Sequence, residues 1–185
     1  MNKEDEISLL IEGCKQGYVK SQQLLYQEFA PILMAICLRF THNETDAEDL
    51  LQEAFIRIFL SLKDFKGEGS FEGWLRRITV NCAINQYHKK KRREQIEVTE
   101  QLNENVAAEE EVELDALVPH EILLDMIQRL PAGCRTVFNL SAIDDYSHEQ
   151  IAQITGLSYN NVTSQLFRAK KSLQRAIKEY LNKIN

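Results

Sequence analysis

Apolar residues recur every three or four positions along most of the chain, a spacing that predicts α-helices. At the N-terminal end the pattern predicts a helix over 4–16, with a break at Gly13 and Gly17. A longer helix follows, and Pro31 inside it is a candidate kink point because proline removes a backbone hydrogen bond. Its apolar positions are Leu24, Leu25, Phe29, Ile32, Leu33, Ile36, Cys37 and Phe40.

The next helix is predicted to begin at Thr45, because Thr45 and Glu48 have the spacing of a capping box. One broad face is apolar and consists of Leu50, Leu51, Ala54, Phe55, Ile58, Phe59 and Leu62. The opposite face carries Asp49, Gln52, Glu53 and Arg57, together with Ile56 and Leu60. Two large aliphatic side chains among charges favour a protein-binding surface, although a neighbouring helix of the same domain would account for them equally well.

A loop is predicted between Phe65 and Phe71, because Gly67 and Gly69 lie close together there. In the helix that follows, the core face is separate from a polar and aromatic stripe, which consists of Trp74, Arg77, Asn81, Asn85 and His88. The helix ends in five consecutive cations: Lys89, Lys90, Lys91, Arg92 and Arg93. Aromatic rings stack on unpaired bases, amides bond base edges and cations pair with phosphates. The stripe therefore indicates single-stranded or melted nucleic acid, although Trp74 taken alone is more typical of a packed core.

The last third of the chain has the spacing of a helix-turn-helix. A helix ends at Pro131, which is expected to be the first residue of the next helix, and Ser147 with Gln150 reads as a second capping box. Ala152, Gly156 and Val162 then follow the small–glycine–aliphatic spacing of the motif, with Ser158 as the expected N-cap of its second helix. The inward positions of that helix are Val162, Leu166, Ala169, Leu173, Ala176 and Ile177.

The outward positions of the same helix suit a DNA major groove, with short polar groups near its start and cations further along. They are Asn160, Asn161, Ser164, Phe167, Arg168, Lys171 and Arg175. An ordinary helical hairpin is the alternative, but it does not explain five cations and no acid between Val162 and Lys178.

Charge along the chain is segregated, although the net charge is only −6. Seven Lys/Arg and no acid lie between Arg76 and Arg93, whereas ten Asp/Glu and no Lys/Arg lie between Glu94 and Glu121. The acidic stretch lacks aromatic residues and is typical of a flexible linker. We therefore expect an all-α protein of two small helical domains, 1–93 and 119–185, joined by a flexible acidic linker over 94–118.

Several classes of protein are disfavoured. No apolar run is long enough to span a membrane, and the polar N-terminus is unlike a secretory signal. The four cysteines fit no zinc spacing and are expected to be buried thiols of a reducing compartment, which favours the cytoplasm. The four histidines are scattered, and the sequence has neither a P-loop nor HExxH. We expect no enzymatic activity, metal, cofactor or small-molecule substrate.

In combination, these motifs resemble bacterial sigma factors. Residues 49–55, the loop 65–74 and the helix of Asn81 and Asn85 resemble region 2, and residues 130–173 resemble region 4. With only these two regions and a short linker, the chain is similar to the extracytoplasmic-function (ECF) group of the sigma-70 family. The resemblance covers about 20–178.

The resemblance implies a promoter-specificity factor that binds core RNA polymerase and promoter DNA, assists melting, and has an anti-sigma partner. The implied polymerase contacts are Asp49, Gln52, Glu53, Ile56 and Phe59. Those with the −10 element are Phe65, Phe71, Trp74, Arg77, Asn81, Asn85, His88 and Lys89 to Arg93. Those with the −35 element are Asn160, Asn161, Thr163, Ser164, Phe167, Arg168, Lys171 and Arg175. Thr163 departs from the family, where Lys or Arg is common. The alternative is a helix-turn-helix regulator that never joins polymerase.

Overall fold

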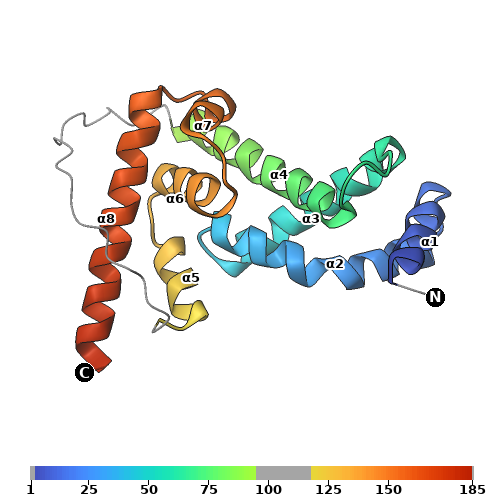
Figure 1. The fold of residues 1–185 in the computed structure, drawn as a ribbon, viewed down its shortest axis with the longest axis horizontal. Coiled ribbons are helices and arrows are strands. Elements are labelled where there is room, and N and C mark those ends of the chain that lie inside the picture. Colours follow the sequence, from blue (N-terminus) through green and yellow to red (C-terminus); the bar gives the residue numbers. More distant parts are fainter. Residues whose placement is uncertain (1–2, 95–117, 185) are drawn as a thin grey trace. The chain divides into compact units, whose positions relative to one another are not determined.

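The computed structural model describes residues 3–94 and 118–184 (Figure 1). Within these residues every regular element is a helix, which confirms the all-α prediction. The chain divides into two compact units, residues 1–83 and 84–185, and the division falls inside helix α4 (Phe71–Glu94). The linker predicted over 94–118 lies almost entirely outside the described residues.

The first unit is built from α1 (Lys3–Lys15), α2 (Val19–Phe40), α3 (Glu44–Ser61), the short 3-10 helix η1 (Leu62–Asp64) and the first half of α4. Helix α2 packs against both α1 and α3, and a three-residue turn joins α2 to α3 (Figure 1). Although Leu24 is 43% exposed, most positions of the predicted apolar faces form the core. Its fully buried large side chains are Leu25, Leu33, Leu50, Ile58, Leu62, Leu75 and Thr79.

The sequence suggested a break at Gly13, but the first helix continues through it. Gly13 lies inside α1 and is buried against α2, where a side chain would collide with Ser21. The turn is made by Gly17 alone, whose φ of 82° lies in the left-handed region. Gly13 is therefore required for the close approach of two helices.

Helix α3 has its N-cap two residues before Thr45, the residue predicted to cap it. Its N-cap is Asn43, whose side-chain oxygen accepts a hydrogen bond of 2.8 Å from the backbone N–H of Asp46. Asparagine is a stronger N-cap than threonine. Thr45 instead lies exposed in the first turn of the helix.

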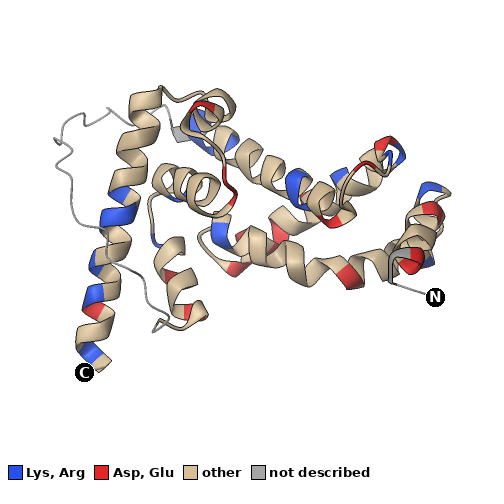
Figure 2. Cartoon of the chain, viewed as in Figure 1, with Lys and Arg blue, Asp and Glu red and all other residues tan. Residues whose placement is uncertain are grey.

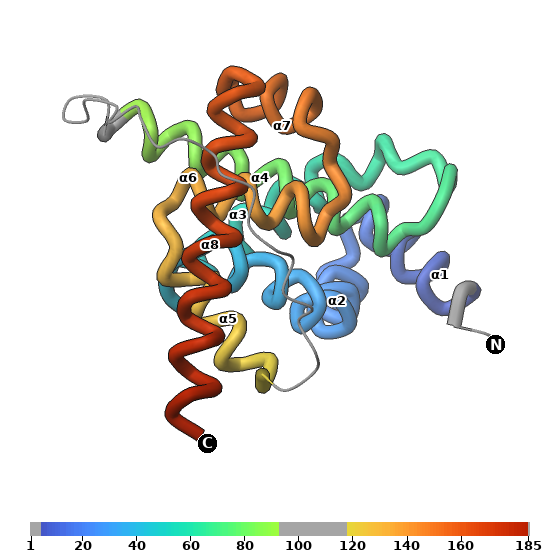
Figure 3. Tube along the Cα trace, turned by 60° about the vertical axis from the view of Figure 1, so that its left-hand side comes forward, coloured from blue at the N-terminus to red at the C-terminus, as the bar shows by residue number. Residues whose placement is uncertain are grey.

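The second unit includes α5 (His120–Gln128), α6 (Ala132–Phe138), the π-helical turn η2 (Asn139–Ile143), α7 (His148–Thr155) and α8 (Tyr159–Ile184). Helices α5, α6 and α7 all pack against the long helix α8 (Figure 3). Five of the six inward positions predicted for α8 are buried, namely Val162, Leu166, Ala169, Leu173 and Ile177. Pro131 is the N-cap of α6 rather than its first helical residue.

Two buried polar side chains, Arg135 and Asn139, are not revealed by the periodicity of the sequence. Arg135 joins α5 to α6, whereas Asn139 bonds within the continuous stretch of α6 and η2. The guanidinium of Arg135 donates to the carbonyl oxygens of Gln128, at 2.6 Å, and Leu130, at 3.3 Å. These carbonyls lie at the end of α5 and just beyond it, so the guanidinium of Arg135 caps the C-terminal end of the helix. Asn139 is fully buried and its amide donates to the carbonyl of Arg135 at 2.9 Å.

All four cysteines are free and buried, as predicted. Burial, and to a smaller extent the neighbouring Cys82 thiol, raises the pKa of Cys37 from 9.0 to about 12. Burial also raises the pKa of Cys14 and of Cys134. The thiols of Cys37 and Cys134 thus stay protonated and unreactive near neutral pH.

The cap assignment predicts that Asn43→Ala lowers the free energy of unfolding of the first unit by about 1 kcal/mol. Thr45→Ala, the matched control two residues further on, leaves it nearly unchanged. Trp74 is the single tryptophan and lies in this unit, so urea unfolding followed by its fluorescence measures both variants. A larger loss for Thr45→Ala than for Asn43→Ala would contradict the assignment.

The raised pKa of Cys37 predicts a pH dependence of stability. The Cys37 thiol loses its proton near pH 9.0 in the unfolded chain and at about pH 12 in the folded chain. Between these pH values the unfolded state therefore binds fewer protons than the folded state. Stability therefore falls as pH rises through this window. Removing the thiol in Cys37→Ala makes the fall between about pH 9 and 11 less steep, as urea titrations at several pH values measure. Identical slopes would contradict the prediction.

Candidate nucleic-acid interface

The turn between α7 and α8 has the geometry of a helix-turn-helix. The Ser147 hydroxyl accepts the backbone N–H of Gln150 at 3.2 Å and the Gln150 side chain accepts that of Ser147 at 2.8 Å, so the predicted capping box is confirmed. Gly156 ends α7 in the left-handed conformation, with φ of 66°. Ser158 caps α8 by accepting the backbone N–H of Asn161 at 3.2 Å. These contacts fix where α8 begins and which face it buries.

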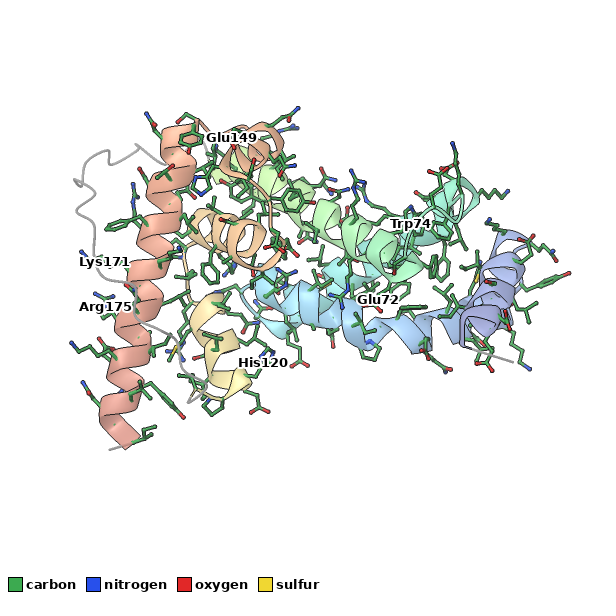
Figure 4. The ribbon with its side chains drawn as sticks, in the orientation of Figure 1. Glu72, Trp74, His120, Glu149, Lys171 and Arg175 are labelled. Atoms are coloured by element: carbon green, nitrogen blue, oxygen red, sulfur yellow. The ribbon has the colours of Figure 1, made fainter. Side chains whose placement is uncertain are left out.

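The start of α7 also holds one carboxylate in its charged form. Glu149, labelled in Figure 4, has a lowered pKa because its own backbone N–H and the Ser147 hydroxyl donate hydrogen bonds to it. Negative charge in the first turn of a helix complements the helix dipole. This stabilises the α7 start without adding a group that binds DNA.

The outer face of α8 is polar and cationic. Arg168, Lys171 and Arg175 are exposed, and Figure 4 shows Lys171 and Arg175 projecting from the side of α8 opposite α5 and α6. Blue segments along the same helix mark its cations in Figure 2. The Lys171 ammonium lies 5.9 Å from the Phe167 ring centroid, and Arg175 contacts Glu179 only at 4.0 Å. The face is open to a polyanion.

Near the start of α8, the polar side chains lie on the same outer face. Asn160 is exposed, whereas Asn161, Ser164 and Phe167 are half-buried. Thr163, at the position that departs from the family, donates its hydroxyl to the carbonyl of Tyr159 at 3.1 Å. Its hydroxyl proton is therefore used within the helix.

The predicted stripe of α4 is partly open. Arg77 and Asn81 are exposed, while Trp74, Asn85 and His88 are half-buried. Of the basic run that follows, Lys89, Lys90 and Arg92 are exposed and Lys91 is half-buried, whereas the side chain of Arg93 lies outside the described part.

Three aromatic rings close the base of the loop before α4. Phe65, Phe71 and Trp74 lie with centroids 5.0, 5.2 and 5.7 Å apart, and Phe71 also contacts Phe29 at 5.5 Å. Phe71 is buried, whereas Phe65 and Trp74 are half-buried. Lys15 of α1 donates to the carbonyl of Phe65 at 3.3 Å. The ends of the loop are thus anchored, and residues 66–70 between them are exposed.

The outer face of α3 is not covered by a described helix of its own unit. Ile56 is 61% exposed and Leu60 is 76% exposed, so the alternative that a neighbouring helix covers them is wrong for the described residues. Asp49 and Gln52 are also exposed, whereas Phe59 is half-buried. Glu53 pairs with Arg57 at 3.0 Å on the same face. This face combines apolar and charged groups in the manner of a protein-binding surface.

The described residues contain no group of three or more His, Cys, Asp or Glu side chains that could hold a metal ion. Among the described helices, none is both long and apolar enough to cross a bilayer.

Comparison with known proteins agrees with both units. Residues 25–93 match the sigma-70 region 2 family, and residues 120–173 match sigma-70 region 4. The chain is 28% identical to the RNA polymerase sigma-H factor of Pseudomonas aeruginosa over 98% of both chains. It is 30% identical to the ECF RNA polymerase sigma-E factor of Haemophilus influenzae, over 91% of this chain and 93% of the relative.

A solved structure also resembles the chain. The sigma factor RpoE of Bartonella quintana, in complex with the anti-sigma factor NepR, matches with a TM-score of 0.49 and 23% identity, over 86% of this chain and 98% of that one.

A protein with a region 2 unit and a region 4 unit of this kind is a transcription initiation factor. The chain belongs to the ECF group of sigma-70 RNA polymerase sigma factors. This membership confirms the resemblance drawn from the sequence and does not favour a regulator that never joins polymerase.

Proposed function

We propose that this sigma factor uses three surfaces: the outer face of α3 for core polymerase, α4 with its preceding loop for the −10 element, and the outer face of α8 for the −35 element. The observation that carries the proposal is the position of Arg168, Lys171 and Arg175, which are exposed on the second helix of a well-formed helix-turn-helix. The buried stripe of α8 leaves this face open for a major groove.

For the −35 element, the chemistry of each side chain determines whether it contacts a base or a phosphate. Asn160, Asn161, Thr163 and Ser164 lie within the first turns of α8, where short polar groups reach base edges. Phe167, Arg168, Lys171 and Arg175 follow. Cations at these positions pair with phosphates, which supply affinity without sequence preference.

For the −10 element, the anchored loop suits capture of an unpaired base. Phe65 and Trp74 are half-buried and offer ring surface for stacking, while Phe71 supports them from the core. Arg77 and Asn81 continue the same surface along α4, and we assign Asn85, His88 and the basic run Lys89 to Arg93 to the adjacent backbone. Extruding a base costs a few kcal/mol, which stacking offsets.

For core polymerase, Asp49, Gln52, Glu53, Ile56 and Phe59 form the docking surface. Exposed aliphatic side chains amid charges are a liability unless a partner covers them. We further propose that an anti-sigma factor binds when polymerase does not. The protein acts in the cytoplasm and performs no catalysis of its own.

The polymerase surface is tested by Ile56→Asp. A charge at the centre of an apolar contact is expected to weaken binding to purified cognate core polymerase by tenfold or more, on the order of 2 kcal/mol. Leu9→Asp is the matched control, because Leu9 is 60% exposed on α1, outside this surface. Equal retention of core polymerase by Ile56→Asp and wild type in a pull-down would contradict the assignment.

The basic end of α4 is tested through the salt dependence of DNA binding by the polymerase complex. Changing Lys89, Lys90, Lys91 and Arg92 to Gln is expected to flatten the slope of log K against log salt. The slope changes by about 0.7–0.9 for each phosphate that the variant no longer neutralises. Lys20→Gln and Lys183→Gln, at exposed cations outside the proposed surfaces, leave the slope unchanged. An unchanged slope in the fourfold variant would show that the run is only a solvated helix end.

A further inference from the structure

Two amide side chains on α8 are joined one helical turn apart. The Gln165 Nε2 donates a hydrogen bond of 3.1 Å to Asn161 Oδ1. The sequence pattern does not place Gln165 among the residues that face DNA. The bond directs the Asn161 oxygen along the helix toward Gln165, so the Nδ2 group of Asn161 keeps its two N–H donors for another partner.

The other end of the Gln165 amide is held inside the unit. Its Oε1 is buried and makes no hydrogen bond. This oxygen lies against Gly133 of α6, where a Cβ would collide with it and would also lie 3.1 Å from Gln165 Cδ. Gly133 is therefore the residue that makes room for the Gln165 side chain.

The charge of this environment decides which way the amide is oriented. Gly133 is the second residue of α6, and Pro131, the N-cap of that helix, provides no side-chain hydrogen bond. The first-turn N–H groups of a helix carry partial positive charge. The Gln165 oxygen makes no hydrogen bond with these groups, but their partial positive charge favours an amide oxygen near them over an NH₂ group. This places the Gln165 nitrogen toward Asn161 and hence the Asn161 oxygen toward Gln165.

We propose that Gln165 is a positioning residue and Asn161 a specificity-determining residue of the −35 interface. Held in this way, Asn161 presents N–H donors, and not its oxygen, to the major groove. Guanine carries two acceptors there, N7 and O6, whereas cytosine carries an amino donor. Asn161 therefore selects guanine and rejects cytosine at the base that it faces. The inference rests on the proposed placement of α8 in the −35 element.

The backbone at Asn161 adds nothing to this selection. Its N–H already donates to the Ser158 hydroxyl at 3.2 Å, so discrimination comes from the side chain alone. An unrestrained asparagine pairs with adenine by accepting from N6 and donating to N7. In this chain the bond from Gln165 holds that oxygen toward Gln165, away from the position that the amino group of adenine would need.

The test uses holoenzyme assembled from the full chain and core polymerase. It transcribes a library built from a promoter that this holoenzyme recognises, with the −35 region randomised. Asn161→Ala is expected to remove a preference for guanine over cytosine of about tenfold at one position and to leave the other positions unchanged. Gln165→Met, which fills similar space but cannot hold Asn161, is expected to lose the same preference at the same position. Gln174→Met, nine residues further along α8, is the control and retains it.

A second substitution at Gln165 is expected to reverse which end of the Asn161 amide faces DNA. The carboxylate of Gln165→Glu only accepts hydrogen bonds, so it draws the NH₂ group of Asn161 inward and turns the oxygen toward DNA. The preferred base at that position is then expected to shift from guanine to adenine or cytosine, which carry amino donors. The shift is a ratio between sequences, so an overall loss of affinity or folded protein does not mimic it.

The inference is overturned if both Gln165 variants keep the full preference for guanine, or if Asn161→Ala weakens all −35 sequences equally. The proposed function fails separately, and the inference with it, if wild-type holoenzyme shows no −35 sequence preference at all. If the wild type has a −35 preference and the Asn161 and Gln165 variants all keep it, the inference is overturned but the proposed function stands.

Discussion

The arrangement of the second unit depends on one constraint, the burial of a single stripe of α8 against α5, α6 and α7. Val162, Leu166, Ala169 and Leu173 are buried at helical spacing. A change in the register of this stripe would bury Arg168 or Lys171, and an unpaired buried cation costs on the order of several kcal/mol. The core therefore fixes which side chains remain outside. The DNA-facing surface is a consequence of packing and of the caps that set where α8 begins.

The first unit couples its core to its surface in a different way. Phe71 is buried against Phe29, yet it also contacts Phe65 and Trp74 at the edge of the exposed loop. The rings that line the loop are thus held by the core itself. The loop between these anchored ends turns through two left-handed glycines, Gly67 and Gly69, and its middle is accessible.

The sequence predicts those features that depend on local periodicity. The buried faces, the Ser147 capping box, Gly156 and the Ser158 cap all follow from residues within a few positions of each other. Errors arise where two signals compete: Asn43 rather than Thr45 caps α3, and Gly13 serves a helix crossing rather than a break. The roles of Arg135 and Gln165 are invisible in the sequence pattern because they rest on contacts between elements. A glycine in the middle of a helical pattern, such as Gly133, is the signal that points to such a contact.

The central claim is that this chain directs core RNA polymerase to promoters, and run-off transcription on genomic DNA fragments tests it most directly. Core polymerase with the wild-type chain is predicted to give discrete transcripts that core alone does not produce. A folded chain that binds core polymerase but yields no transcript from any genomic fragment would contradict the claim.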